Sequence, residues 1–132
     1  MVNIDDFTSL YFQTSQEQLS EMLETLKTLQ KKEYNEQAIK TMRRLAHTIK
    51  GKSLMMGFTT FGTLFKSIEE LFRTCQEYHQ SIKAALLDEL RDVLITMQRQ
   101  LTAKEKHTEE PNDLESAQKT VYTLLQTITT KD

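Results

Sequence analysis

Proline and glycine are scarce in this chain of 132 residues, which holds one proline and three glycines. Folds with many tight turns use both residue types at those turns, so the scarcity argues against such folds. Long helices joined by short polar connections are favoured instead. The length predicts a single domain with enough residues for a hydrophobic core.

Apolar residues recur at helical spacing in five segments, and no segment shows the alternation of a strand. The predicted helices cover about residues 4–29, 35–54, 59–75, 81–103 and 112–130. A polar linker at about 104–111 contains Pro111. Asn35 is a candidate N-cap of the second helix, and Gly57 is a candidate stop after it. Asn112 and Glu115 have the spacing of a capping box, which would open the last helix.

The second and third predicted helices are joined by only a few residues and should be antiparallel neighbours. Gly51 and Gly62 would let the flanks of these two helices approach closely. Glu69 lies on the border of the apolar stripe of the third helix, so we expect it to face the second helix.

A histidine lies on the outer face of the second predicted helix. At 100° per residue, the centre of its apolar stripe lies about 150° from His47. The outward face carries Lys40, Arg43, His47, Lys50, Gly51 and Leu54. A glycine inside a helix costs about 1 kcal/mol relative to alanine. The notch at Gly51 therefore predicts that another group must come close to His47.

Positive charge is concentrated around this histidine. No acidic residue occurs between Glu36 and Glu69. The six cations of that interval are Lys40, Arg43, Arg44, Lys50, Lys52 and Lys66. A run of like charges is often only a solvated face, and that interpretation stays open on the charge pattern alone.

These residue types together support phosphoryl chemistry on an imidazole. An exposed histidine is a competent nucleophile near neutral pH. A carboxylate that accepts the proton of one ring nitrogen fixes the tautomer, and Glu69 is the candidate for this role with His47. Lys50 and Lys66 would flank a phosphoryl group on His47 and offset its charge, while Gly51 leaves space for an incoming group.

The segment Ala46-His47-Thr48-Ile49-Lys50-Gly51, followed by Gly57-Phe58, resembles the signature of histidine phosphotransfer (HPt) domains. It is most similar to the N-terminal phosphotransfer domain of CheA-type chemotaxis histidine kinases. The similarity extends to Ile4–Phe7 and to Glu109–Asn112, and so covers nearly the whole chain. The resemblance implies an all-α fold, an up-down antiparallel four-helix bundle over about 4–103 with an additional C-terminal helix.

The same resemblance implies that His47 is the phosphorylated residue and that Glu69 hydrogen-bonds its imidazole. The implied partners are a histidine kinase ATP-binding domain and a response-regulator receiver domain. The chain departs from the family pattern at Lys52, at the bulky Leu54-Met55-Met56, and at Lys66 in place of a second histidine. We expect these departures to affect the transfer rate and the choice of partner.

Exposed residues around the histidine should determine which partner docks, and the candidates are Arg43, Arg44, Leu54 and Met55. The chain has no P-loop and no dense acidic pocket for Mg²⁺, so ATP and Mg²⁺ are expected on partner domains, with no bound cofactor. No metal site is expected, because the histidines lack the spacing for one. His79, His107 and Cys75 are predicted to have no chemical role.

The chain is expected to be a cytoplasmic monomer without a membrane segment. One alternative function is a helical docking module whose basic face binds an acidic protein partner without chemistry. Nucleic-acid binding through the same face is a weaker alternative, because no interleaved aromatic residues accompany the charges. The sequence leaves open whether the chain is a free-standing carrier or the first domain of a kinase.

Overall fold

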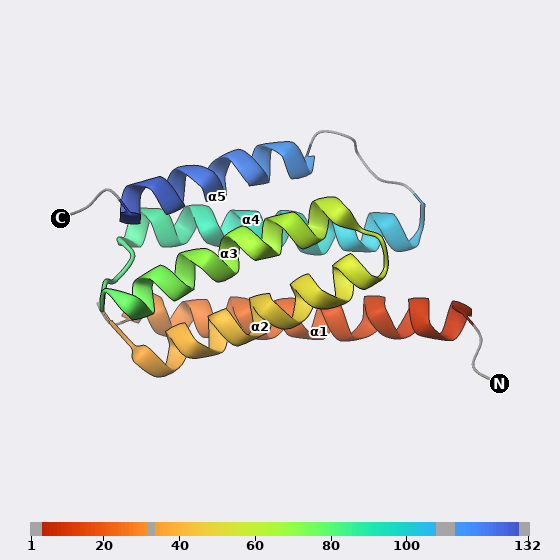
Figure 1. Ribbon diagram of the computed structural model, residues 1–132, viewed down its shortest axis with the longest axis horizontal. Coiled ribbons are helices and arrows are strands. Elements are labelled where there is room, and N and C mark those ends of the chain that lie inside the picture. Colours follow the sequence, from red (N-terminus) through yellow and green to blue (C-terminus); the bar gives the residue numbers. More distant parts are fainter. Residues whose placement is uncertain (1–3, 32–33, 108–112, 130–132) are drawn as a thin grey trace.

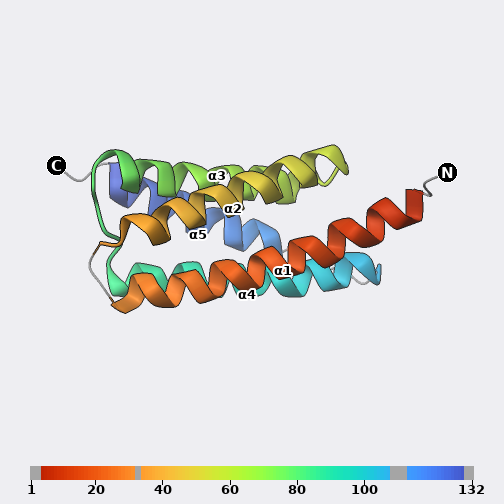
Figure 2. The same cartoon turned by 90° about the horizontal axis from the view of Figure 1, so that it is seen from below.

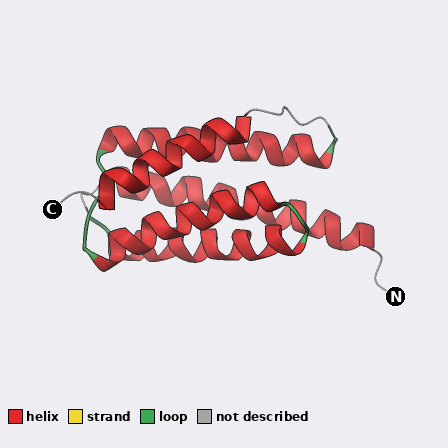
Figure 3. Ribbon diagram, turned by 45° about the horizontal axis from the view of Figure 1, so that its top comes forward, coloured by secondary structure: helices red, strands yellow, loops and turns green. Residues whose placement is uncertain are grey.

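The computed structural model describes residues 4–31, 34–107 and 113–129, and these ranges form helices and short connections (Figure 1, Figure 3). The helices are α1 (Ile4–Lys31), α2 (Glu36–Met55), α3 (Thr59–Glu77), α4 (Ala84–Glu105) and α5 (Asp113–Thr129). The predicted all-α class is confirmed. The capping box predicted at Asn112 lies outside the described residues.

The helices form a closed ring in which α5 lies between α3 and α4. Close backbone contacts join α1 with α2, α2 with α3, α3 with α5, α5 with α4, and α4 with α1. Among the described residues, α3 and α4 make no such contact with each other. Figures 1 and 2 together show α5 beside both of these helices. The additional C-terminal helix is therefore part of the bundle wall.

The core is filled by the apolar faces of all five helices. The strong period of α3 buries Phe61, Phe65 and Phe72 completely. From α5, Val121 and Leu124 are buried to the same extent, so the fifth helix covers core surface that α3 and α4 would otherwise expose. Burying a large apolar side chain stabilises a fold by roughly 1.5–3 kcal/mol.

Both predicted end signals of α2 are confirmed. The side chain of Asn35 accepts a hydrogen bond from the backbone N–H of Ala38 at 3.0 Å. At the other end Gly57 has a φ of +80°, and the next N–H, of Phe58, donates to the carbonyl of Ser53 at 2.9 Å. This is a Schellman motif, and it turns the chain directly into α3.

The fourth helix begins at Ala84, three residues after the predicted start at residue 81. Residues 81–83 are not helical, and Lys83 has an extended ψ of 148°. Since α5 separates α3 from α4, the connection has to bridge a wider gap than a direct helix-to-helix turn would. Extended residues span more than twice the length of helical ones, which accounts for the late start.

Two histidines close helices where glycine is the usual residue. His79 follows α3 with a φ of 49°, and His107 follows α4 with a φ of 57°. Both hold the left-handed conformation that ends a helix. The sequence analysis predicted no chemical role for these two histidines and missed their backbone role at the helix ends.

Candidate functional site

The packing of α2 sets the direction of His47. Leu45, Ala46 and Ile49 are buried in the core. Because these residues occupy the inner face of the helix, the side chain of His47 points outward and is 65% exposed. This exposure confirms the sequence prediction of an outward-facing imidazole.

The antiparallel pairing of α2 with α3 brings Glu69 to the histidine. Glu69 Oε2 lies 2.7 Å from His47 Nδ1, and Glu69 Oε1 lies 2.7 Å from Lys50 Nζ. The Glu69 side chain is only 18% exposed. Burial raises the pKa of this carboxyl, but hydrogen bonds from Lys50 and His47, together with their charges, outweigh burial and lower it. Glu69 is therefore a carboxylate at neutral pH.

These distances also assign the proton on the ring. A nitrogen and a carboxylate oxygen 2.7 Å apart need a hydrogen between them, so Nδ1 of His47 donates to Glu69. Lys50 Nζ lies 3.4 Å from the same Nδ1, which then has no lone pair to accept from it. The other nitrogen, Nε2, keeps its lone pair and has no hydrogen-bond partner in the described part of the chain.

Lys50 has a contact that the sequence analysis did not predict. Its ammonium lies on the Nδ1 side of the ring and binds Glu69. Lys50 therefore fixes the position of the Glu69 carboxylate, which in turn orients the His47 ring through its hydrogen bond. The predicted contact of Lys50 with an added phosphoryl group stays a prediction. Lys66 is exposed on α3, one turn before Glu69, and forms no ion pair within the described ranges. Together with the hydrogen bond and charge of Arg73, the charge of Lys66 lowers the pKa of Glu70. The predicted place of Lys66 beside a phosphoryl group stays a prediction.

The two glycines that lie inside the helices of the α2–α3 hairpin, Gly51 and Gly62, have different surroundings. A Cβ atom at Gly51 would meet nothing within 4 Å, which agrees with the predicted open notch near His47. A Cβ atom at Gly62 would lie 2.6 Å from Leu54 Cγ, well inside contact distance. Only Gly62 therefore lets the two helices approach closely, and the prediction that Gly51 shares this role is wrong.

A shallow groove of about 410 Å³ borders His47 on the side toward the start of α2. Its lining residues are Lys40, Arg43, Arg44, His47, Thr48, Glu69 and Gln76. Arg43 Nη1 donates to Gln76 Oε1 at 2.9 Å, and Arg44 Nη2 lies 3.6 Å from Glu21 Oε1. The sequence prediction includes both arginines but misses Gln76 and Glu21, which contact them from neighbouring helices.

The other predicted docking residues lie toward the C-terminal end of α2. Leu54 is 49% exposed and Met55 is 89% exposed. Lys52 faces α1 instead, where its Nζ donates to Thr14 Oγ1 at 2.8 Å and lies 5.9 Å from the ring centre of Tyr11. Partial burial lowers the pKa of Lys52. Lys52 therefore belongs to the α1–α2 contact.

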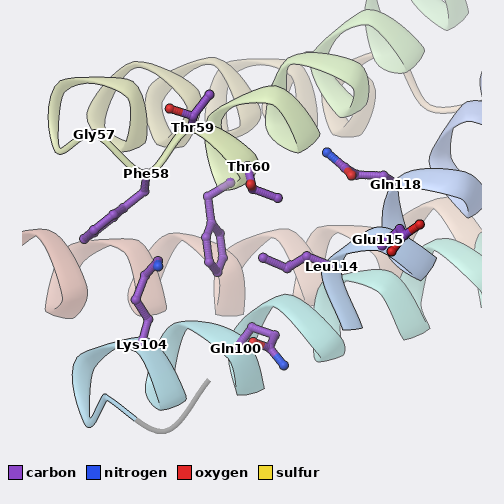
Figure 4. A pocket seen from close by; sticks show the side chains of 10 residues that line it. Gly57, Phe58, Thr59, Thr60, Gln100, Lys104, Leu114, Glu115 and Gln118 are labelled. Atoms are coloured by element: carbon purple, nitrogen blue, oxygen red, sulfur yellow. The ribbon is translucent and has the colours of Figure 1, made fainter. Parts of the chain in front are cut away.

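A larger hollow of about 750 Å³ lies away from the histidine, among the start of α3, the end of α4 and the start of α5 (Figure 4). Phe58 and Leu114 line it, together with Lys104, whose Nζ lies 4.7 Å from the Phe58 ring centre. No histidine or cysteine is among the described residues that line it.

Other chemistry has little support in the described residues. No three of the histidine, cysteine, aspartate and glutamate side chains described here form a group that could hold a metal ion. Cys75 is buried, and burial raises the pKa of its thiol to about 12, which agrees with the predicted inert role. Within the described ranges, no helix has the length and apolar character to cross a membrane.

Comparison with known proteins decides the family. The family model for the Hpt domain matches residues 6–100, which include the whole histidine site. The chain belongs to the Hpt domain family. Hpt domains carry out phosphotransfer in two-component signalling, where they interact with kinases and response regulators. The resemblance found in the sequence is confirmed at family level. Comparison with curated proteins gave no match.

Proposed function

We propose that His47 is the phosphoryl carrier of this Hpt domain, in a relay of the chemotaxis type. It accepts the group from the ATP-binding domain of a histidine kinase and passes it to an aspartate of a receiver domain. The observation that carries this proposal is the 2.7 Å contact between Glu69 and Nδ1, which leaves Nε2 of an exposed ring as the nucleophile.

In the loading step, the Nε2 lone pair attacks the γ-phosphorus of ATP bound to the kinase. A P–N bond forms, the P–O bond to ADP breaks, and ADP leaves with the bonding electrons. The ring gains positive charge while Nδ1 keeps its proton. Glu69 stabilises that charge through the existing hydrogen bond, and Lys50 keeps the carboxylate in place from its other oxygen.

In the transfer step, the receiver aspartate attacks phosphorus and the P–N bond breaks. The electron pair returns to Nε2, which gives back the neutral imidazole with its proton still on Nδ1. Lys66 offsets phosphoryl charge from α3, and the notch at Gly51 gives the incoming carboxylate access. Leu54 and Met55 are proposed to contact the docked partner beyond this notch.

ATP and Mg²⁺ are supplied by the kinase domain in this scheme, and the chain acts as a monomer in the cytoplasm. The chain provides the nucleophile, its orientation and the docking face. A phosphoryl carrier of this kind has no turnover of its own without a donor and an acceptor.

The test is loading with phosphoramidate, a small phosphoryl donor that needs no kinase. We expect one phosphoryl group per chain, with a ³¹P resonance coupled to Nε2 of His47. Base-stable, acid-labile label is expected for a phosphohistidine. Glu69→Gln should load more slowly, since a neutral amide holds Nδ1–H less strongly than a carboxylate does.

His47→Gln is the decisive variant, and the double variant of His79 and His107 to glutamine is its matched control. Label that persists in His47→Gln, or that disappears in the control, would refute the assignment. A His47→Gln protein that supports signalling normally would favour the alternative of a docking module without chemistry.

A further inference from the structure

Arg43 is a fixed cation whose charge has no acidic partner in the described part of the chain. It lies one helical turn before His47, about 6 Å along the axis of α2. Its guanidinium is held across the groove by Gln76 Oε1 at 2.9 Å. An amide oxygen fixes the side chain but does not cancel the charge, and a preorganised side chain loses less conformational entropy on binding.

Arg44, the neighbouring cation, does have an acidic partner. Its guanidinium lies 3.6 Å from the Glu21 carboxylate, and both side chains are more than half exposed. That pair partly neutralises Arg44 and leaves its position loose. Glu69, the acid nearest the groove, already binds Lys50 and His47. Lys40 also lines the groove, but no side-chain hydrogen bond to another described residue fixes its ammonium. Among the described residues of the groove, Arg43 is thus the positive charge that is held in place and not paired with a carboxylate.

Of the two half-reactions, transfer to the acceptor has the greater need for this charge. Once loaded, His47 carries a phosphoryl dianion, and the acceptor approaches it with a carboxylate. Two like charges then come together, whereas in the loading step the imidazole that ATP approaches is neutral. A fixed cation beside the ring offsets this repulsion and favours an acidic acceptor surface.

We propose that Arg43, held by Gln76, is the anchor that binds a carboxylate on the receiver domain during transfer. This inference rests on the proposed phosphorylation of His47. Arg43 acts through docking and does not touch the reacting atoms. Its guanidinium forms a paired hydrogen bond to a surface carboxylate of the receiver domain, distinct from the aspartate that attacks phosphorus.

The experiment measures transfer from the loaded chain to the receiver domain that accepts fastest in a purified panel. The chain is loaded first with phosphoramidate, and transfer is followed at low and at high salt. Arg43→Gln removes the anchor. Gln76→Glu keeps Arg43 but adds a carboxylate that neutralises it. Lys27→Gln is the matched control, because it removes one positive charge from an exposed ion pair on α1.

At low salt we expect Arg43→Gln and Gln76→Glu each to reduce kcat/KM for transfer about tenfold, mainly through a higher KM. The kcat/KM of these two variants should also depend less on salt concentration than that of the wild type. Arg44→Gln should lose less, since Glu21 already shares its charge. Lys27→Gln should match the wild type. Loading of His47 by phosphoramidate should succeed in every variant.

Three results would overturn the proposal that Arg43 binds the receiver domain. One is a loss below about threefold, relative to Lys27→Gln, in either Arg43→Gln or Gln76→Glu. Another is a loss in Arg44→Gln as large as in Arg43→Gln. The third is a defect in loading from kinase and ATP with transfer unchanged, which would assign Arg43 to the donor. If the wild type does not become phosphorylated at His47, the proposed function is refuted, and the proposed role of Arg43 is refuted with it.

Discussion

Gly62 and Leu54 form a contact whose energy can be measured by a double-mutant cycle. A Cβ atom added at Gly62 would lie 2.6 Å from Leu54 Cγ, about 1 Å inside the usual carbon–carbon contact distance. Overpacking of this kind costs about 1–3 kcal/mol. Replacing a glycine inside a helix by alanine returns about 1 kcal/mol of helix propensity. Gly62→Ala alone should therefore be neutral or destabilising by up to about 2 kcal/mol.

The same change should become stabilising when Leu54 is alanine. The obstructing atoms are then gone, and only the propensity gain of about 1 kcal/mol remains. The coupling free energy between the two sites is expected to be about 1–3 kcal/mol. Urea unfolding of the four proteins, followed by far-ultraviolet circular dichroism, measures it directly.

Gly51→Ala supplies the control for this cycle. No atom lies within 4 Å of the Cβ position at Gly51, so the variant should gain about 1 kcal/mol in either Leu54 background. A coupling between Gly62→Ala and Leu54→Ala below about 0.5 kcal/mol would show that the helices do not meet at this contact as described.

Three further predictions concern the acid, the fifth helix and a helix end. The lowered pKa of Glu69 means that its stabilising contribution is complete above the unfolded glutamate pKa of about 4.3 and is lost as pH falls through the lower folded value. The difference in unfolding free energy between wild type and Glu69→Gln should therefore shrink from pH 7 to pH 3, and a constant difference would contradict this. Leu124→Ala should lower the unfolding free energy by about 2–5 kcal/mol, whereas a helix merely resting on the surface would lose under about 1 kcal/mol. His107→Gly should raise thermal stability by about 0.5–1 kcal/mol, and a loss on calorimetry would argue against the left-handed conformation.

The local signals of α2 were sufficient to predict its position and direction. Its apolar period defines the buried face, and Asn35 and Gly57 define its ends through backbone rules that depend on few neighbours. The outward direction of His47 follows from these features. Its pairing with Glu69 was also predictable, because a short connection fixes the register of an antiparallel hairpin.

The partner of Lys50 could not be predicted in the same way. A lysine reaches several positions through its flexible chain, and its choice depends on which acceptor lies nearby in three dimensions. The second oxygen of Glu69 becomes available only when α2 and α3 pack. The same reasoning applies to Arg43, because the amide of Gln76 lies at the end of α3 and no motif marks it.

The place of α5 in the ring was beyond sequence reasoning as well. A periodic apolar stripe predicts that a helix buries one face, but it does not say which groove receives that face. The order of helices around the core depends on packing among residues distant in sequence. The late start of α4 has the same origin, since the connection must reach past α5.

The position of α5 has a practical consequence for protein engineering. The family match ends at residue 100, whereas Val121 and Leu124 lie inside the shared core. A chimera joined at the family boundary would carry an open seam between α3 and α4, lined with aliphatic and aromatic side chains. Grafting this phosphotransfer unit onto another signalling protein therefore requires the segment through residue 129 to travel with it.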